Sequence, residues 1–216
     1  MKVLFGGTFD PFHLGHEHVV RTLLNLYPIQ TFWIVPTHRN PHKQDSQSTP
    51  ANHRLKITET AVQGMGDPRV RVLDWEIARP GPSYTVDTLE RFNKELAGDE
   101  IPALVFGNEV FGSFPKWKQP MRILELAHGI VIRRTSSGRA VSDVLANLGI
   151  RDATIDPSNA TRLWHSNHSR FIDQREIQAR PFSATALRKE LQGPDMPQGI
   201  QRSVWLYIKE NGLYAV

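Results

Sequence analysis

Two histidines near the start of the chain stand three residues apart, in the segment Gly6-Gly7-Thr8-Phe9-Asp10-Pro11-Phe12-His13-Leu14-Gly15-His16. On a helix this spacing places both imidazoles on one face. The two leading glycines let the backbone approach a ligand closely. The helix that follows directs N–H groups and its positive dipole end at that ligand. The segment therefore predicts a phosphate-binding site that includes His13 and His16, with Gly15 leaving room for a flat or charged group.

Other chemistries fit this segment less well. It is neither the dinucleotide fingerprint G-x-G-x-x-G nor a P-loop, because its glycines are adjacent and no G-K-[ST] follows. A zinc site of His13, His16 and His18 lacks the H-E-x-x-H spacing, and residues 16 and 18 face different sides of a helix. We expect no metal ligands here, and ordinary surface or capping histidines remain the plain alternative.

A second candidate phosphate site lies near the C-terminus, in Phe182-Ser183-Ala184-Thr185-Ala186-Leu187-Arg188. Ser183 and Thr185 stand at the start of a predicted helix, and Arg188 follows within one turn. Hydroxyl groups and a guanidinium at such a place suit the β- and γ-phosphates of a nucleotide. A simple capped surface helix is the alternative.

The elements that must position these residues follow from the apolar pattern. Short apolar runs predict strands at 1–5, 31–35, 70–73, 103–106 and 129–133. Helical spacing predicts helices at 14–26, 51–62, 84–96, 140–148, 183–191 and 200–209. The proline-rich stretch 36–50 is a predicted loop whose length favours binding, and 151–170 is too polar to assign.

The alternation of strands and helices predicts an α/β fold: a Rossmann-like, doubly wound parallel sheet with helices on both faces and a short C-terminal helical portion. Ligands of such folds bind at the carboxyl ends of the strands. The first strand-to-helix turn, which holds His13, is therefore the expected site. No linker or repeat interrupts the chain, so we expect a single domain over residues 1–216.

The composition of the chain limits the kinds of ligand and partner that we expect. The chain has no cysteine, which excludes disulfides and thiolate metal sites. Its net charge of +4 favours phosphate-rich ligands, but no dense Lys/Arg cluster predicts nucleic-acid binding. No apolar run approaches 18 residues and no signal peptide is evident, so we expect a cytoplasmic protein without a membrane partner.

The first segment is similar to the H-x-G-H signature of the nucleotidyltransferase superfamily. Its longer form with Thr-Phe-Asp-Pro resembles the bacterial nicotinate mononucleotide adenylyltransferases. Further segments similar to that family follow in the same order: Asn40-Pro41-His42-Lys43, His53-Arg54-Leu55, 81–89, Phe114-Pro115-Lys116-Trp117, 182–188 and 204–214. The resemblance implies adenylyl transfer from ATP to nicotinate mononucleotide, which gives nicotinate adenine dinucleotide and pyrophosphate in NAD biosynthesis.

The resemblance also implies roles for individual residues. The catalytic set would be His13 and His16 on the α- and β-phosphates, with Lys43 and Arg188 on the outgoing pyrophosphate. The ATP site would comprise Gly6, Gly7, Thr8, Phe9, His13, His16, Gly107, Glu109, Ser183, Thr185 and Arg188. The acceptor site would comprise Thr8, Lys43, Tyr84, Thr85 and Trp117. Mg²⁺ would be held mainly by the ATP phosphates.

In the acceptor site, Ser83 is expected to cap a helix. The amides of Tyr84 and Thr85 would then hold the nicotinate carboxylate, and Trp117 would stack on the pyridine ring. Helix capping alone, and a tryptophan that only fills the core, are the competing interpretations.

Two departures from the family pattern stand out. Glu109 occupies the place of an aspartate, and Ala184 replaces a serine. One alternative function is therefore a nucleotidyltransferase that uses nicotinamide mononucleotide or another phosphorylated acceptor. A non-catalytic, regulatory nucleotide-binding protein is a second alternative. The sequence leaves open whether the chain forms a homo-oligomer and what residues 151–180 do.

Overall fold

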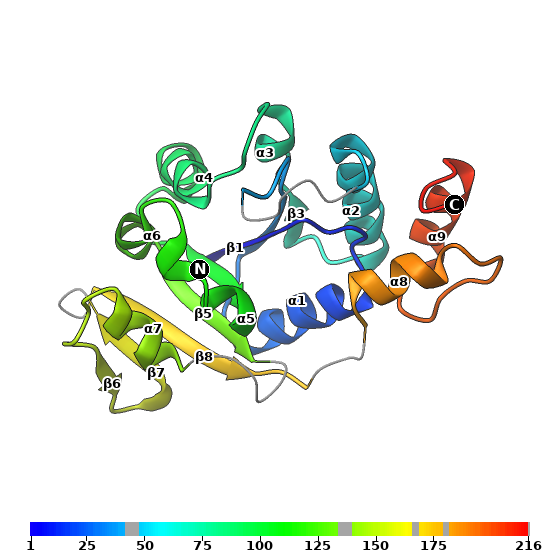
Figure 1. The fold of residues 1–216 in the computed structure, drawn as a ribbon. Coiled ribbons are helices and arrows are strands. Elements are labelled where there is room, and N and C mark those ends of the chain that lie inside the picture. Colours follow the sequence, from blue (N-terminus) through cyan, green and yellow to red (C-terminus); the bar gives the residue numbers. More distant parts are fainter. Residues whose placement is uncertain (42–47, 134–139, 166–168, 179–181, 216) are drawn as a thin grey trace. The chain divides into compact units, whose positions relative to one another are not determined.

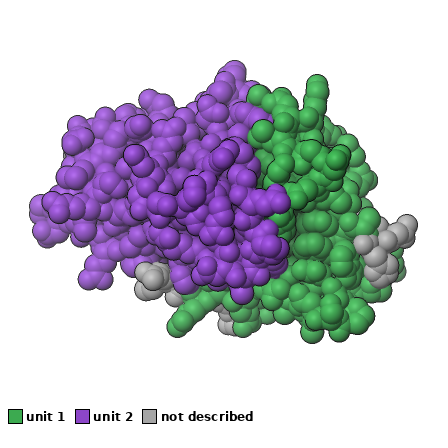
Figure 2. All heavy atoms as spheres, turned by 180° about the vertical axis from the view of Figure 1, so that it is seen from behind, with its two compact units in different colours: residues 1–5, 84–179 green, residues 6–83, 180–216 purple. Residues whose placement is uncertain are grey.

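The computed structural model describes residues 1–41, 48–133, 140–165, 169–178 and 182–215 (Figure 1). The chain divides into two compact units, coloured separately in Figure 2. Unit 1 comprises Met1–Phe5 and Tyr84–Ala179, and unit 2 comprises Gly6–Ser83 and Arg180–Val216. The single domain expected over the whole chain stays a prediction.

The described strands form an eight-stranded sheet in the order β3-β2-β1-β4-β5-β8-β7-β6. Their bounds are β1 Lys2–Gly7, β2 Thr31–Pro36, β3 Val70–Val72, β4 Ala103–Gly107, β5 His128–Arg133, β6 Thr154–Asp156, β7 Asn159–His165 and β8 Arg170–Glu176. The pairs β1–β4, β4–β5, β5–β8 and β2–β3 are parallel. The pairs β6–β7 and β7–β8 are antiparallel. The predicted α/β fold with a mainly parallel sheet is thus confirmed.

Nine α-helices are found among the described residues, with two further helical turns. They are α1 Leu14–Leu26, α2 Ala51–Met65, α3 Trp75–Ala78, α4 Thr85–Phe92, α5 Asn108–Phe111, α6 Pro120–Leu126, α7 Val141–Asn147, α8 Ala184–Glu190 and α9 Arg202–Glu210, with the turns η1 Asn93–Ala97 and η2 Phe114–Lys116. The helices longer than seven residues were all predicted within a few positions. The short α3, α5 and α6 were not, because they lack several repeats of the helical spacing. In the described part of the chain, no helix has the length and apolar character needed to cross a membrane.

The core of unit 1 is centred on β4 and β5. Residues Ala103–Phe106 and Ile130–Ile132 are buried along their whole length. A strand covered on both faces has no reason to alternate with polar residues, which explains the continuous apolar runs in the sequence. Gly129 pairs with Ile172 across the ladder, and a Cβ at this glycine would lie 3.1 Å from the Ile172 side chain. The close approach of β5 and β8 therefore favours a residue without a side chain there.

In unit 2 the first two helices bury one face each. Helix α1 buries Val19, Val20, Leu23 and Leu24, at the spacing that an amphipathic helix requires. The buried face of α2 comprises Arg54, Ile57, Thr58, Ala61 and Met65. An arginine is thus aligned with the apolar residues of α2, and its surroundings are part of the candidate site.

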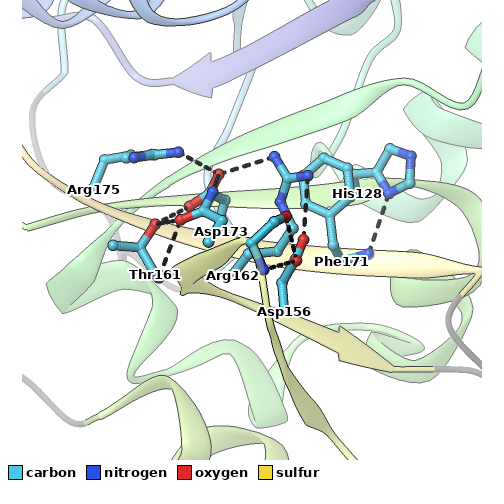
Figure 3. Close-up of polar contacts among 9 residues, drawn as sticks. His128, Asp156, Thr161, Arg162, Phe171, Asp173 and Arg175 are labelled. Atoms are coloured by element: carbon cyan, nitrogen blue, oxygen red, sulfur yellow. Dashed lines mark hydrogen bonds and ion pairs between the residues drawn. The ribbon is translucent and has the colours of Figure 1, made fainter.

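Strands β6, β7 and β8 occupy much of the stretch that the sequence left unassigned (Figure 1). These strands are polar for a structural reason. Asp173 on β8 is fully buried, and charged side chains surround it (Figure 3). Its carboxylate accepts hydrogen bonds from Thr161 Oγ1 at 2.7 Å, Arg175 Nη2 at 2.8 Å and Arg162 Nη2 at 3.3 Å. A buried carboxylate is tolerated only with such partners. The polar residues needed for this network obscure the strand pattern.

His128, at the start of β5, stacks on Phe171 of β8 with ring centroids 4.0 Å apart. Its Nδ1 accepts the backbone N–H of Phe171 at 3.2 Å, a contact drawn in Figure 3. Burial, followed by the positive charges of Arg170 and Arg162, lowers the pKa of His128 from 6.5 to about 4. The folded protein therefore holds this imidazole in its neutral form at physiological pH.

This lowered pKa predicts acid sensitivity of unit 1. Between pH 6.5 and about 4 the unfolded chain binds a proton at His128 that the folded chain does not, so the free energy of unfolding should fall as the pH falls through this window. Urea unfolding at pH 7, 6, 5 and 4.5 measures the slope. His128→Gln should flatten it. An equal slope in the variant would contradict the assignment.

Candidate active site

The two histidines of the first turn lie against each other at the start of α1. His13 is the N-cap residue, and its Nδ1 accepts the N–H of Gly15 at 3.1 Å. The N–H of His13 in turn donates to Nδ1 of His16 at 3.3 Å. The rings stack with centroids 3.8 Å apart and planes 24° apart. The structure thus brings together the pair that the sequence spacing placed on one face.

These backbone contacts fix which nitrogen of each ring carries the proton. Because each Nδ1 accepts an N–H group, each must present a lone pair. In a neutral imidazole the proton then resides on Nε2, which becomes a donor. His13 and His16 therefore offer two Nε2–H groups side by side at a helix N-terminus, an arrangement suited to the oxygens of a phosphate.

Close packing holds the two rings in place. A Cβ at Gly15 would lie 2.9 Å from Cε1 and Nδ1 of His13, so the flat group that rests against this glycine is the His13 ring itself. Phe9 is buried and meets the His16 ring edge-on at 5.0 Å between centroids. A Cβ at Gly7 would lie 2.8 Å from the Phe9 ring. A larger residue at either glycine would clash with a neighbouring ring. Gly7 therefore makes room for Phe9, and Gly15 makes room for His13.

The backbone of the first turn is held from one side. The carbonyl of Gly7 accepts the N–H of Thr37 at 2.9 Å, and the carbonyl of Thr8 accepts Nη1 of Arg54 at 2.7 Å. In a trans peptide the C=O and the next N–H point in opposite directions. The N–H groups of Thr8 and Phe9 therefore point away from Thr37 and Arg54. Gly6 is exposed, and a Cβ there would meet nothing within 4 Å.

Arg54, which the sequence did not single out as a site residue, is 1% exposed and binds four carbonyl groups. Its Nη1 donates to Thr8 at 2.7 Å and to Thr37 at 2.6 Å, its Nη2 donates to His38 at 2.7 Å, and its Nε donates to Thr49 at 2.9 Å. Burial lowers its pKa, and Asp10 opposes that effect. Its place on the apolar face of α2 was the signal that could have identified it.

Helix α8 provides the second candidate phosphate site. Ser183 is its N-cap residue, and the Ser183 hydroxyl accepts the N–H of Ala186 at 3.1 Å. Arg188 Nη2 donates to Thr185 Oγ1 at 3.3 Å, and Arg188 Nη1 donates to the carbonyl of Asp10 at 2.8 Å. Arg188 is thereby tied to the loop that precedes His13, so the two predicted phosphate segments of unit 2 are connected.

Of the predicted acceptor residues, Thr8 belongs to the first turn of unit 2, whereas Tyr84, Thr85 and Trp117 lie in unit 1. Tyr84 is the N-cap residue of α4 and Thr85 its first residue, so their N–H groups have no acceptor within the helix. Lys118 Nζ lies 4.6 Å from the centre of the Tyr84 ring and 2.9 Å from Oδ1 of Asp87. The expected cap by Ser83 is wrong: the Ser83 hydroxyl accepts the N–H of His38 at 3.0 Å instead.

Trp117 is half-buried and packs on an aromatic cluster. Its ring lies 5.8 Å from Phe106 and 5.6 Å from Phe114 between centroids. Gly107 ends β4, and Glu109 is exposed in the first turn of α5. Trp117 is thus anchored by its neighbours without being fully enclosed, which fits either of the interpretations that the sequence allowed. Lys43 lies outside the described residues.

A model of the cytidylyltransferase-like family matches residues 4–190, so the chain belongs to this family. The matched range includes the first turn, both candidate phosphate segments and the acceptor residues of unit 1. Arg188 lies inside it, close to its end.

Within this family, the chain is similar along nearly its whole length to proteins named as probable nicotinate-nucleotide adenylyltransferases. One from Pseudomonas fluorescens is 34% identical over 98% of this chain and 95% of its own. One from Desulfatibacillum aliphaticivorans is 31% identical over 98% of both. A solved structure titled as the nicotinic acid mononucleotide adenylyltransferase of Plasmodium falciparum complexed with NaAD shares the fold, with a TM-score of 0.73, 18% identity and 99% and 96% coverage.

The contact between Gly15 and His13 yields a direct test. In Gly15→Ala the new methyl group must displace the His13 ring, so we expect inorganic pyrophosphate to bind at least about tenfold more weakly, the usual cost of losing a hydrogen bond to a charged group. The fold should persist, because alanine favours a helix more than glycine does. Calorimetric titration measures the affinity, and thermal unfolding is the control. Unchanged affinity would show that the His13 position is unimportant.

Proposed function

We propose that the protein transfers the adenylyl group of ATP to nicotinate mononucleotide and releases pyrophosphate, giving nicotinate adenine dinucleotide. The phosphate of the mononucleotide attacks the α-phosphorus of ATP, a P–O bond forms, and the bond to the β-phosphate oxygen breaks. Such transfer depends mainly on positioning and on stabilising the negative charge that develops. The chain's family and its named relatives support this reaction.

The observation that carries the proposal is the stacked pair His13 and His16. Each Nδ1 accepts a main-chain N–H, so in the neutral rings Nε2 carries the proton, at the start of α1, where the helix dipole also favours an anion. In the proposed reaction they donate to the oxygens around the α- and β-phosphates. Preorganised donors of this kind need little rearrangement when charge builds up in the transition state.

Arg188, with Lys43, is proposed to hold the outgoing pyrophosphate. The Arg188 guanidinium is already oriented by Asp10 and Thr185, which lowers the cost of ordering it around a ligand. Backbone groups of Gly6, Gly7, Thr8 and Phe9 line the reacting phosphate, and Ser183 and Thr185 complete the α8 end. Gly107 and Glu109 are proposed to contact the ribose of ATP.

Mg²⁺ is proposed to enter with ATP. The described donors of the phosphate site are imidazole and guanidinium N–H groups, which bind phosphate oxygens, whereas Mg²⁺ takes oxygen ligands. The residues therefore fit a phosphate that carries its own ion, held by phosphate oxygens and water. When bound, the ion supplies neutralisation of phosphate charge.

For the acceptor, the N–H groups of Tyr84 and Thr85 are proposed to bind the nicotinate carboxylate, and Trp117 to stack on the pyridine ring. Lys118 Nζ lies beside the Tyr84 ring and is paired with Asp87 at 2.9 Å, so the two charges offset each other. The proposed preference for nicotinate over nicotinamide mononucleotide therefore rests on the N–H groups of Tyr84 and Thr85.

Substrate preference provides the first test. Pyrophosphate release from ATP and Mg²⁺ should be much faster with nicotinate mononucleotide than with nicotinamide mononucleotide, since the carboxylate gains the N–H groups near Tyr84. Parallel assays with a coupled phosphate readout measure kcat/KM for both. Faster release with the amide would overturn the acceptor site, and no release with either would overturn the proposed function.

The role of His16 gives a second test. His16→Ala should lower kcat by roughly 10²-fold with the fold intact, the usual cost of a lost charge-stabilising donor. His18→Ala is the matched control, because His18 lies on the same helix outside the stacked pair. Circular dichroism checks the fold of both. A His16→Ala variant that keeps more than about half of the wild-type kcat would exclude the proposed role.

A further inference from the structure

The C-terminal tail returns to the first turn of unit 2. After α9 the chain turns at Gly212, with φ of 59°, and at Tyr214, with φ of 64°. A left-handed conformation is uncommon for a residue with a large side chain. At Tyr214 it accompanies a hydrogen bond of 2.6 Å from the phenol to Oδ1 of Asp10, 204 positions earlier. The tail is therefore held in a costly conformation by a specific polar contact.

Asp10 connects this contact to the candidate phosphate site. It is 6% exposed, and its Oδ2 accepts the N–H of Thr49 at 3.3 Å. Its backbone carbonyl accepts Nη1 of Arg188 at 2.8 Å. Asp10 thus binds the tail residue Tyr214 through its side chain. It binds Arg188, the arginine proposed to hold pyrophosphate, through its main-chain carbonyl. A shift of the Asp10 side chain would therefore move the carbonyl that orients Arg188.

The phenol is well suited to hold Asp10. Burial raises the pKa of Tyr214 above its ordinary range, and the Asp10 carboxylate raises it further. The hydroxyl therefore keeps its proton and remains a donor at neutral pH. Hydrogen bonds from a buried hydroxyl to a carboxylate are short and strong, which agrees with the 2.6 Å separation.

We propose that Tyr214 is a positioning residue for the phosphate site: its hydroxyl holds Asp10, and Asp10 holds the Arg188 guanidinium in the orientation that binds pyrophosphate. This inference rests on the proposed function for the role of Arg188. It assigns the C-terminal tail a role in the reaction in addition to its contacts within the fold.

Tyr214→Phe removes the hydroxyl alone and is the direct test. Tyr207→Phe is the matched control, since the Tyr207 hydroxyl makes a similar contact, 2.8 Å from Nδ1 of His53, on α9 of the same unit. We expect Tyr214→Phe to weaken the binding of inorganic pyrophosphate, measured by calorimetry, by about tenfold, the usual cost of losing a hydrogen bond to a charged group. In steady-state assays kcat/KM for ATP should fall by a similar factor, with KM for the acceptor unchanged. Tyr207→Phe should change neither quantity.

A double-mutant cycle identifies the route of the effect. If Tyr214 acts through Arg188, Tyr214→Phe should have almost no further effect on pyrophosphate affinity in the Arg188→Ala background. Additive losses would overturn the proposal, as would equal losses in Tyr214→Phe and Tyr207→Phe. Urea unfolding shows whether each variant is folded. If Tyr214→Phe is not, Asp10→Asn weakens the same bond and must give the same non-additive result.

The binding measurement also separates this inference from the proposed function. Pyrophosphate binding that follows the predicted pattern, in a protein that releases no pyrophosphate from ATP with either pyridine nucleotide, would support the positioning role and overturn the proposed reaction. If instead the wild type releases pyrophosphate and Tyr214→Phe changes neither pyrophosphate binding nor kcat/KM, the proposed reaction would be supported and the positioning role overturned.

Discussion

The hydrogen bonds of the buried Arg54 guanidinium are the interaction on which the candidate phosphate site of unit 2 depends. A charge with 1% exposure is unfavourable unless its donors are satisfied, and here four backbone carbonyls accept them. Those carbonyls belong to the first turn, the segment that follows β2 and the segment before α2. One side chain thus joins three stretches of chain that have no regular structure of their own. Its loss would remove the hydrogen-bond donors of four main-chain carbonyls at once.

Because Arg54 and Thr37 bind the carbonyls of Thr8 and Gly7, the first turn can present its N–H groups on the other side. The same principle acts on the histidines, whose Nδ1 atoms are occupied by main-chain N–H groups. In both cases contacts with main-chain groups orient the atoms of the candidate site. The proposed recognition of phosphate in this unit would therefore be prepared largely by such contacts, with the side chains adding charge.

Local features of the fold and site could be predicted from the sequence. The spacing of His13 and His16, the long helices and the buried strands follow from short-range rules, and the structure agrees with them. Ser83 and Tyr214 could not be predicted, because their partners His38 and Asp10 are distant in sequence. Strands β6 to β8 were not predicted either, since the buried Asp173 and its arginine partners resemble the composition of a solvated loop. Sequence periodicity does not distinguish a polar residue that is buried with partners from one in water.

The edge of the described sheet at β6 has a consequence for solubility. This strand has only three residues, and its pairing with β7 is irregular between Ile155 and Asp156. Ile155 is 62% exposed, so an apolar side chain stands on an open edge. Short, irregular edges with charged neighbours are how natural sheets avoid adding strands from other chains. The short length of β6 and its irregular pairing therefore discourage this edge from templating aggregation.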